Sequence, residues 1–266
     1  MSSASKPCIL EFERVFHSYE KDSPFIQELS FSISEGAFIG LLGANGSGKS
    51  TILKLACGIL KPSSGRLTLW GKDLLAQNSR DRAKLISYLP QTLDISVPFT
   101  VKELVSMGLY PYDIPPALSV DEALNMVGLR DKANARLTDL SGGERRRTFI
   151  CMTLVQGAGL LLLDEPLANL DIKYQIELVK LLKNLRETRN IAVIMALHDI
   201  NMALQFEKVI LIKDGNLIGS GRPDDVLSQG MLKKAFGVNV EVIRSASHGA
   251  YISYDSNFTE RRSERN

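Results

Sequence analysis

The stretch G-A-N-G-S-G-K-S at residues 43–50 decides how this chain is interpreted. It matches the pattern G-x-x-x-x-G-K-[ST] at every fixed position. Its three glycines let the backbone curl so that several N–H groups point toward one bound anion. Lys49 adds a positive charge for the β- and γ-phosphates of a nucleotide, and the hydroxyl of Ser50 can bind Mg²⁺. The stretch therefore predicts a phosphate-binding loop.

The flanking residues favour this interpretation over a glycine-rich turn that matches by chance. Residues 37–42 form an apolar run typical of a buried strand, and residues 49–60 have the pattern of a helix. A helix that begins at the loop directs the positive end of its dipole at the phosphates. A chance match is expected in about one chain in a hundred of this length. The residues predicted to contact the nucleotide here are Gly43, Asn45, Gly46, Ser47, Gly48, Lys49, Ser50 and Thr51.

Length and composition limit the class of protein. The 266 residues allow one domain with an appended piece, or two small domains. A net charge of +2, from 32 basic and 30 acidic residues spread along the chain, gives no reason to expect nucleic-acid binding. The longest apolar run, residues 191–197, is too short to span a bilayer, and residues 1–7 lack the apolar core of a secretory signal. Cys8, Cys57 and Cys151 have no metal-ligand spacing, which predicts buried or incidental thiols in a reducing, cytosolic compartment.

Apolar periodicity and turn residues predict strands that alternate with helices, as in an α/β fold with a parallel sheet. Strands are expected at residues 9–15, 24–34, 67–70, 86–89, 160–163, 191–197, 209–213 and 217–219, with edge strands to about residue 254. Further helices are expected at residues 80–85, 120–127, 224–227 and 231–236, and after residues 100, 141 and 171. We expect one domain over residues 1–254, with a helical subdomain at about residues 92–157 and a disordered polar tail at 255–266.

Three polar or aromatic side chains near the predicted nucleotide site have an ordinary structural explanation when each is taken alone. Tyr19 alone is an aromatic residue at a strand end, but beside a nucleotide its ring can stack on adenine, at about 1–3 kcal/mol by analogy with base stacking. Gln91 follows a predicted strand, where a glutamine is usually solvent-facing or bonded to backbone. His17 is expected to be a surface residue rather than a ligand.

The segment L-S-G-G-E at residues 140–144 opens a helix. Ser141 and Glu144 have the spacing of a capping box, which is a purely structural role. Gly142 and Gly143 are costly in a helix, however, at about 1 kcal/mol each relative to alanine. A helix start without side chains can bind an anion, and three arginines follow it at residues 145–147. This segment therefore predicts a second anion site.

Acidic residues follow the predicted strand L-L-L-L at residues 160–163. Two adjacent carboxylates, Asp164 and Glu165, are unfavourable at the end of an apolar strand unless they have a function. Asp164 suits Mg²⁺ held opposite Ser50, and Glu165 suits a general base for an attacking water. His198 follows a later buried strand, at the sheet edge where such folds bind ligands.

Taken in order, Tyr19, the phosphate loop, Gln91, L-S-G-G-E, L-L-L-L-D-E-P, N-L-D and His198 resemble the ATPase subunit of an ABC transporter over residues 8–245. The resemblance implies a P-loop ABC ATPase core with a parallel sheet, N-terminal antiparallel strands and a helical subdomain insert. It also implies ATP and Mg²⁺ as ligands. Two copies would pair head to tail, so that each ATP lies between one phosphate loop and the partner's L-S-G-G-E.

The same resemblance assigns roles to the remaining candidates. Gln91 would sense the γ-phosphate, join Ser50 and Asp164 around Mg²⁺, and contact a membrane subunit. Glu165 would be the base and His198 would hold the γ-phosphate. The nucleotide-binding or interface residues on the partner-facing side would be Ser141, Gly142, Gly143 and Asp171.

A finer resemblance, to importers of iron–siderophore, haem and cobalamin chelates, is carried by Y-L-P-Q, M-G-L-Y-P-Y, L-S-G-G-E-R-R-R and L-H-D-I-N-M-A. Relatives often have Arg in place of Leu109 and Thr in place of Leu167. The family implies polytopic permease subunits, an indirect substrate-binding protein, no nucleic acid, and a cytoplasmic position on the inner face of the membrane. An apolar cluster at residues 97–112 suggests that Tyr110 or Tyr112 contacts the permease.

Three alternatives remain beside this interpretation. An importer with another cargo, such as an oxyanion or a metal ion, would have the same ATPase motifs. A non-transport ABC ATPase is disfavoured, because translation-type members usually carry two cassettes and chromosome-maintenance members a long coiled coil. A regulator that binds nucleotide without hydrolysis would be expected to lack Glu165 or His198, and both are present.

Overall fold

The computed structural model describes residues 6–20, 23–93, 98–245 and 249–254 of the chain. The predicted tail at residues 255–266 and Val97 of the apolar cluster lie outside the described residues. Within the described residues, no helix is both long and apolar enough to cross a bilayer.

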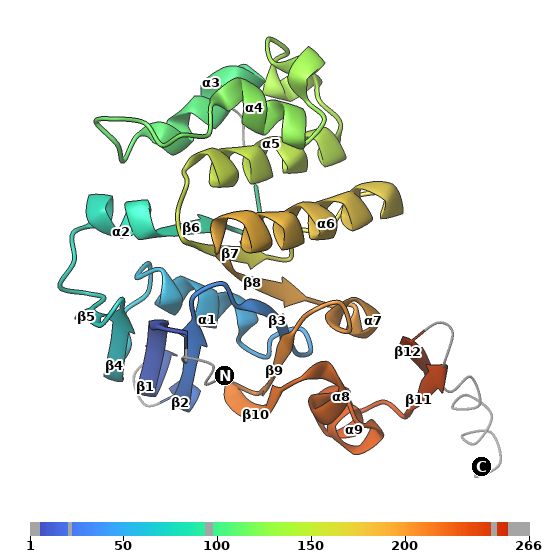
Figure 1. Cartoon of the computed structure of the whole chain (residues 1–266). Coiled ribbons are helices and arrows are strands. Elements are labelled where there is room, and N and C mark those ends of the chain that lie inside the picture. The colour runs from blue at the N-terminus through green and yellow to red at the C-terminus, as the bar shows by residue number, and fades with distance from the viewer. Residues whose placement is uncertain (1–5, 21–22, 94–97, 246–248, 255–266) are drawn as a thin grey trace, which may run out of the picture.

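A six-stranded sheet forms the centre of the molecule, in the order β10-β9-β3-β8-β7-β6 (Figure 1). The strands β3, β6, β7, β8 and β9 are parallel, and β10 pairs antiparallel with β9. Every residue of β3, β7 and β8 is buried, which explains why these strands are continuous apolar runs. The predicted α/β fold with a mainly parallel sheet is confirmed. The bounds are β3 (Phe38–Leu42), β6 (Ile86–Leu89), β7 (Leu160–Asp164), β8 (Ala192–Leu197), β9 (Lys208–Lys213) and β10 (Asn216–Gly221).

A second, antiparallel sheet has the order β2-β1-β4-β5. Its strands are β1 (Cys8–Glu20), β2 (Ser23–Ser34), β4 (Ser64–Leu69) and β5 (Lys72–Asp73). Helix α1 (Lys49–Ala56) packs with residues of both sheets in one apolar core. The helix is shorter than predicted, because the backbone of Gly58 is left-handed (φ +72°) and ends it.

A second core on the other face of the central sheet contains most of the remaining helices. Figure 1 shows α3, α4 and α5 stacked above α6 and the central strands. Capping boxes begin α3, α4 and α5 at Thr100, Ser119 and Ser141, and the one at Ser141 confirms the prediction from its spacing. The division into one domain with a helical subdomain stays a prediction. The bounds here are α2 (Ser79–Leu85), α3 (Val101–Ser106), α4 (Val120–Met126), α5 (Gly142–Val155) and α6 (Ile172–Arg189), with short 3₁₀ turns at Met107–Leu109, Arg130–Lys132 and Leu137–Asp139.

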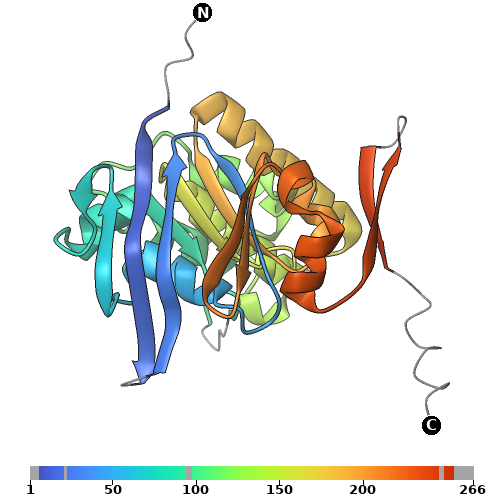
Figure 2. The same cartoon turned by 90° about the horizontal axis from the view of Figure 1, so that it is seen from below.

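The C-terminal region adds α7 (Ile200–Ala203), α8 (Pro223–Val226), α9 (Gln229–Phe236), β11 (Val240–Ser245) and β12 (Gly249–Tyr254). The sequence predicts the last two strands as sheet edges, but they form a separate two-stranded sheet at one side of the molecule (Figure 2). The side chain of Asn201 in α7 attaches this hairpin to the core. Its Nδ2 donates to Ile252 O (3.0 Å), and its Oδ1 accepts from Ile252 N (2.7 Å).

The predicted apolar cluster near residue 110 is only partly exposed. Pro111 is buried, and Phe99 and Leu109 pack against the core. The hydroxyl of Tyr112 donates to Lys84 O (3.3 Å), whereas Tyr110 is 87% exposed. The cluster is therefore mainly a local core, because most of its apolar side chains have partners within the chain.

Candidate active site

The phosphate loop connects the end of β3 to the start of α1. Gly46 and Gly48 have left-handed backbone, with φ of +77° and +109°. A Cβ on Gly43 would lie 2.4 Å from Ile212 O, so a side chain does not fit there. Helix α1 begins without a side-chain cap, and its first N–H groups are left for a bound anion.

Lys49 lies inside the loop rather than on the surface. Its ammonium group donates to Gly43 O (2.8 Å) and Ala44 O (3.2 Å). Burial lowers the pKa of Lys49, while the negative charges of Glu165 and Asp164 oppose this shift. The hydroxyl of Ser47 is buried with no hydrogen-bond partner among the described residues. The loop thus contains the positively charged ammonium group of Lys49 and polar atoms whose arrangement suits a phosphate group.

One cavity of about 280 Å³ joins the loop to three predicted residues from distant parts of the chain. Gln91 follows β6, Glu165 follows β7 and His198 follows β8, and these strands are adjacent and parallel. Because the carboxyl ends of parallel strands meet at the same edge of a sheet, the three side chains converge. The cavity is lined by Phe25, Asn45, Gly46, Ser47, Gly48, Lys49, Ser50, Thr51, Gln91, Glu165 and His198.

Glu165 is the centre of this group. Its backbone is left-handed (φ +51°), which is uncommon for a residue other than glycine. Its Oε2 accepts a hydrogen bond from Gln91 Nε2 (2.7 Å) and also contacts His198 Nε2. Glu165 is almost completely buried, and the His198 side chain is about half exposed. A carboxylate in this position can accept a proton from a water in the cavity.

Asp164, the last residue of β7, is the candidate metal ligand. It is 1% exposed, and Tyr88 OH donates to its Oδ2 (3.4 Å). Burial raises the pKa of Asp164, although a hydrogen bond from Ser50 acts in the opposite direction. The other oxygen, Oδ1, is buried without a partner among the described residues. A carboxylate that interacts with Ser50 and keeps one oxygen free suits Mg²⁺ that is held mainly by phosphates.

Among the described residues, no group of three or more His, Cys, Asp or Glu side chains could hold a metal by itself. That finding is compatible with Mg²⁺ bound together with a nucleotide, because Mg²⁺ commonly takes one or two protein oxygens, phosphate oxygens and water. The residues at the site therefore fit an Mg²⁺ ion that is bound together with a nucleotide.

Tyr19 lies next to the phosphate loop. Its hydroxyl hydrogen-bonds to Thr51 Oγ1 (2.8 Å), and its ring is 60% exposed. Phe25 and His17 flank the ring, with centroids 5.5 and 4.9 Å away. The prediction that His17 is a surface residue is wrong: it is buried, and its Nδ1 donates to Lys61 O (2.9 Å). An exposed face of Tyr19 thus remains available for stacking.

The L-S-G-G-E segment does not line the same cavity. It begins α5, and α5 and α1 pack in the cores on opposite faces of the central sheet. A Cβ on Gly142 would meet nothing within 4 Å, and one on Gly143 would make only ordinary contacts. Packing within this chain therefore does not require these glycines. Asp171 precedes α6, is exposed, and makes no capping hydrogen bond.

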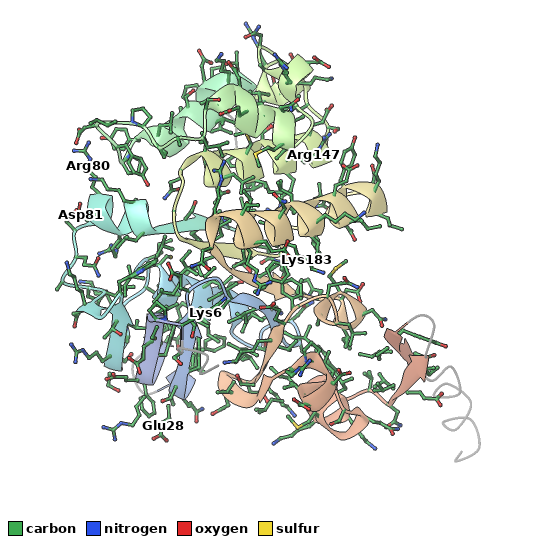
Figure 3. All side chains as sticks on the ribbon, viewed as in Figure 1. Lys6, Glu28, Arg80, Asp81, Arg147 and Lys183 are labelled. Atoms are coloured by element: carbon green, nitrogen blue, oxygen red, sulfur yellow. The ribbon has the colours of Figure 1, made fainter. Side chains whose placement is uncertain are left out.

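The three arginines at residues 145–147 do not all point toward one anion site. Arg146 is buried and donates only to backbone carbonyls. Arg147 extends from α5 toward α6 (Figure 3), where its guanidinium lies 3.9 Å from the ring centroid of Tyr174. The sequence does contain a signal for Arg146, because helical spacing puts it on the face of Phe149 and Ile150, which are buried.

Comparison with known proteins agrees with this geometry. Residues 26–168 match the family described as ABC transporter. The petrobactin import ATP-binding protein FpuC of Bacillus anthracis is 37% identical over 246 residues, which are 90% of this chain and 90% of that protein. The hemin import ATP-binding protein HmuV of Nitrobacter winogradskyi is 37% identical over 228 residues, which are 82% of this chain and 84% of that protein.

A solved structure is similar as well. The dimeric post-hydrolysis state of the ATP-binding cassette MJ0796, bound to ADP and Pi, has a TM-score of 0.73 and 26% identity, and covers 81% of this chain and 99% of that one. The phosphate loop, the converging strand ends and the extent of these matches lead to one conclusion. This chain is an ATPase that belongs to the ABC transporter family.

Proposed function

We propose that this chain is the ATP-hydrolysing motor subunit of an importer, and that the importer's cargo is a metal chelate: an iron–siderophore complex, haem or cobalamin. The observation that carries the hydrolytic part is the single cavity joining the phosphate loop to Gln91, Glu165 and His198. A γ-phosphate held by the loop would lie among these side chains, within reach of an attacking water.

Each residue of the site has a separate role in the proposed reaction. Lys49 and the loop N–H groups hold the phosphates and offset their negative charge. The water oxygen attacks the γ-phosphorus while Glu165 accepts a proton from that water. The bond from the γ-phosphorus to the leaving oxygen of ADP breaks in the same step. Gln91 and His198, which contact the Glu165 carboxylate here, align the water and the γ-phosphate. Tyr19 supports the adenine.

Ser50, Gln91 and Asp164 would hold Mg²⁺ beside the phosphates. When bound, Mg²⁺ would neutralise charge that develops on the β- and γ-phosphate oxygens. The free Oδ1 of Asp164 supports this assignment.

The complete site would need a second copy of the chain. Ser141, Gly142 and Gly143 lie away from the chain's own phosphate loop, and the two glycines are not required by packing. A bare helix start of this kind suits the γ-phosphate of a nucleotide bound to a partner copy. Asp171 would lie at the same interface. The similar MJ0796 cassette is described as dimeric, which supports a head-to-tail pair.

The names of the relatives support the proposed cargo and an import function. FpuC is named for petrobactin import and HmuV for hemin import, which supports the proposed class of cargo. We infer that two copies of this chain bind polytopic permease subunits at the inner face of the cell membrane, in the cytoplasm, and act indirectly on a substrate-binding protein. Nucleic acid has no part in this function.

The proposal can be tested by measuring cargo uptake in a strain from which the gene for this subunit has been deleted. Restoring the wild-type gene should restore uptake of one of three cargoes (a ferric siderophore, haem or cobalamin), and Lys49→Ala should not. Loss of an oxyanion, metal-ion, sugar or amino-acid uptake, with all three chelates unaffected, would contradict the cargo but not the ATPase activity. A purified chain that binds ATP without hydrolysing it would contradict the motor function itself.

A further inference from the structure

Arg146 connects two segments that carry candidate site residues. Its guanidinium donates to five backbone carbonyls in two loops. Those of the first loop are Pro90 O (3.0 Å) and Gln91 O (3.0 Å), and those of the second are Asp164 O (2.8 Å), Glu165 O (2.7 Å) and Pro166 O (3.4 Å). Arg146 itself belongs to the second turn of α5, two residues after the end of L-S-G-G-E.

The chemistry of this contact is unusual for a buried arginine. The residue is 5% exposed, and all five of these acceptors are main-chain oxygens rather than a carboxylate. Burial lowers the pKa of Arg146, and the charges of Asp164 and Glu165 partly offset that effect. A guanidinium has five N–H donors in a rigid plane, so it can bond several oxygens of two loops at once. A lysine or an amide cannot span the same set.

The backbone of Glu165 shows why such a connection is needed. Its φ of +51° is left-handed, and the proline at position 166 further disfavours compact backbone at the preceding residue. Strained backbone persists only where the surrounding structure determines it. Arg146 bonds the carbonyls on both sides of this strained residue, and Ala168 N (3.2 Å) also donates to Glu165 O.

We propose that Arg146 is a positioning residue for ATP hydrolysis: it holds the loops that carry Gln91 and Glu165 in the geometry in which these two side chains meet. The inference rests on the proposed hydrolytic function. Arg146 does not touch the nucleotide cavity, and it acts on the reaction through the backbone of the two loops. Because it is on α5, it also ties the start of that helix to the same two loops.

Three variants of the full-length chain test this role. Arg146→Gln removes the charge and most of the donors, and Arg146→Lys keeps the charge but not the planar fork. Arg186→Gln is the matched control, because Arg186 is a partly buried arginine on α6 that donates to Gly36 O (2.8 Å). We would measure kcat, KM, the Kd of a fluorescent ATP analogue, and hydrogen exchange along the chain.

The expected result is a split between turnover and binding. Arg146→Gln should lower kcat at least thirtyfold and change the Kd by less than threefold, with Arg146→Lys intermediate. Amide exchange should rise at least tenfold across residues 164–170 and stay unchanged across residues 43–51. Arg186→Gln should keep the wild-type kcat.

Several outcomes would overturn the proposal. A folded Arg146→Gln with a kcat within threefold of wild type would do so. A loss of activity in proportion to the unfolded fraction, with exchange raised equally in both segments, would mean that Arg146 only stabilises the fold. Where Arg146→Gln does not fold, the same criteria apply to Arg146→Lys, with a tenfold lower kcat expected. A wild-type chain without ATPase activity would overturn the proposed function, and this role with it.

Discussion

The side-chain amide of Gln91 donates a 2.7 Å hydrogen bond to the carboxylate of Glu165, and this bond joins the ends of two neighbouring parallel strands. The same carboxylate oxygen contacts His198, from the end of the next strand. In this arrangement the proposed base is already paired with two side chains. Both contacts are to Oε2, so Gln91 and His198 fix the orientation of the carboxylate from which Glu165 would act on a water.

Replacing the proposed base should separate binding from turnover. Glu165→Gln keeps the shape of the side chain and one oxygen for the Gln91 and His198 contacts, but it cannot accept the proton. We expect ATP affinity to change little and kcat to fall roughly 10²–10⁴-fold, the usual contribution of a general base. Lys49→Ala should instead weaken ATP binding. Steady-state hydrolysis and equilibrium binding measure both, and wild-type turnover by Glu165→Gln would remove Glu165 from the mechanism.

The second prediction concerns assembly. ATP that binds two copies at once favours the paired state by mass action. We expect Glu165→Gln with Mg²⁺ and ATP to form a dimer that traps two nucleotides, and the nucleotide-free chain to be monomeric or weakly associated. Adding Ser141→Arg should prevent the dimer, because the new side chain would fill the start of α5. Light scattering gives the mass, and a mass that does not change with ATP would contradict the head-to-tail arrangement.

Asp164 should make the stability of the nucleotide-free chain depend on pH. Burial raises its pKa, so the folded chain binds this proton more tightly than the unfolded chain does. Its contribution to stability is therefore present below the ordinary carboxyl pKa and is lost as pH rises through the raised pKa. At neutral pH, Asp164→Asn should melt a few degrees higher than wild type. Thermal unfolding across pH tests this.

The melting difference should disappear as the pH is lowered to the ordinary carboxyl range. Mg²⁺ and ATP should reverse the order, since only the wild type has the carboxylate for Mg²⁺. A difference in melting temperature that is the same at every pH would show that desolvation of Asp164 is not its cause.

Asn201 should determine how firmly the C-terminal hairpin is attached. Its amide makes two hydrogen bonds to the backbone of Ile252, each contributing about 1 kcal/mol. Asn201→Ala removes both the donor to Ile252 O and the acceptor for Ile252 N, so exchange of the Ile252 amide should rise at least about tenfold. Asn216→Ala, at the first residue of β10, is the control. Unchanged exchange at Ile252 would mean that packing alone holds the hairpin.

Tyr110 is the better candidate for contact with a membrane subunit. Tyr112, the other candidate, is partly buried and bonded to Lys84 O. Tyr110→Glu should leave the ATPase activity of the isolated chain unchanged and reduce cargo uptake by the assembled transporter at least tenfold. Tyr112→Phe, which loses only the hydroxyl bond, should not affect uptake. Transport assays in membrane vesicles measure this, and normal uptake by Tyr110→Glu would exclude Tyr110 from that interface.

The phosphate loop and the capping box at Ser141 could be predicted from the sequence because each depends on residues that are close in the chain. Gly46 and Gly48 allow left-handed backbone locally, and Ser141 bonds to the amide of Glu144, three residues away. The buried strands were equally clear, since an apolar run of five or six residues between turns is typical of a strand covered on both faces.

The tertiary structure determined which polar side chains are buried and which hydrogen-bond partners they have. His17 is buried, and Lys61, 44 residues later in the chain, provides the backbone acceptor for its Nδ1. Arg146 is buried because the ends of β6 and β7 present carbonyls around one helix turn. Strand order sets these distances, and Gln91 meets Glu165 across 74 residues because β6 and β7 are neighbours in the sheet. Sequence determines which groups can bond, and the packing of the strands determines which of them come within hydrogen-bond reach.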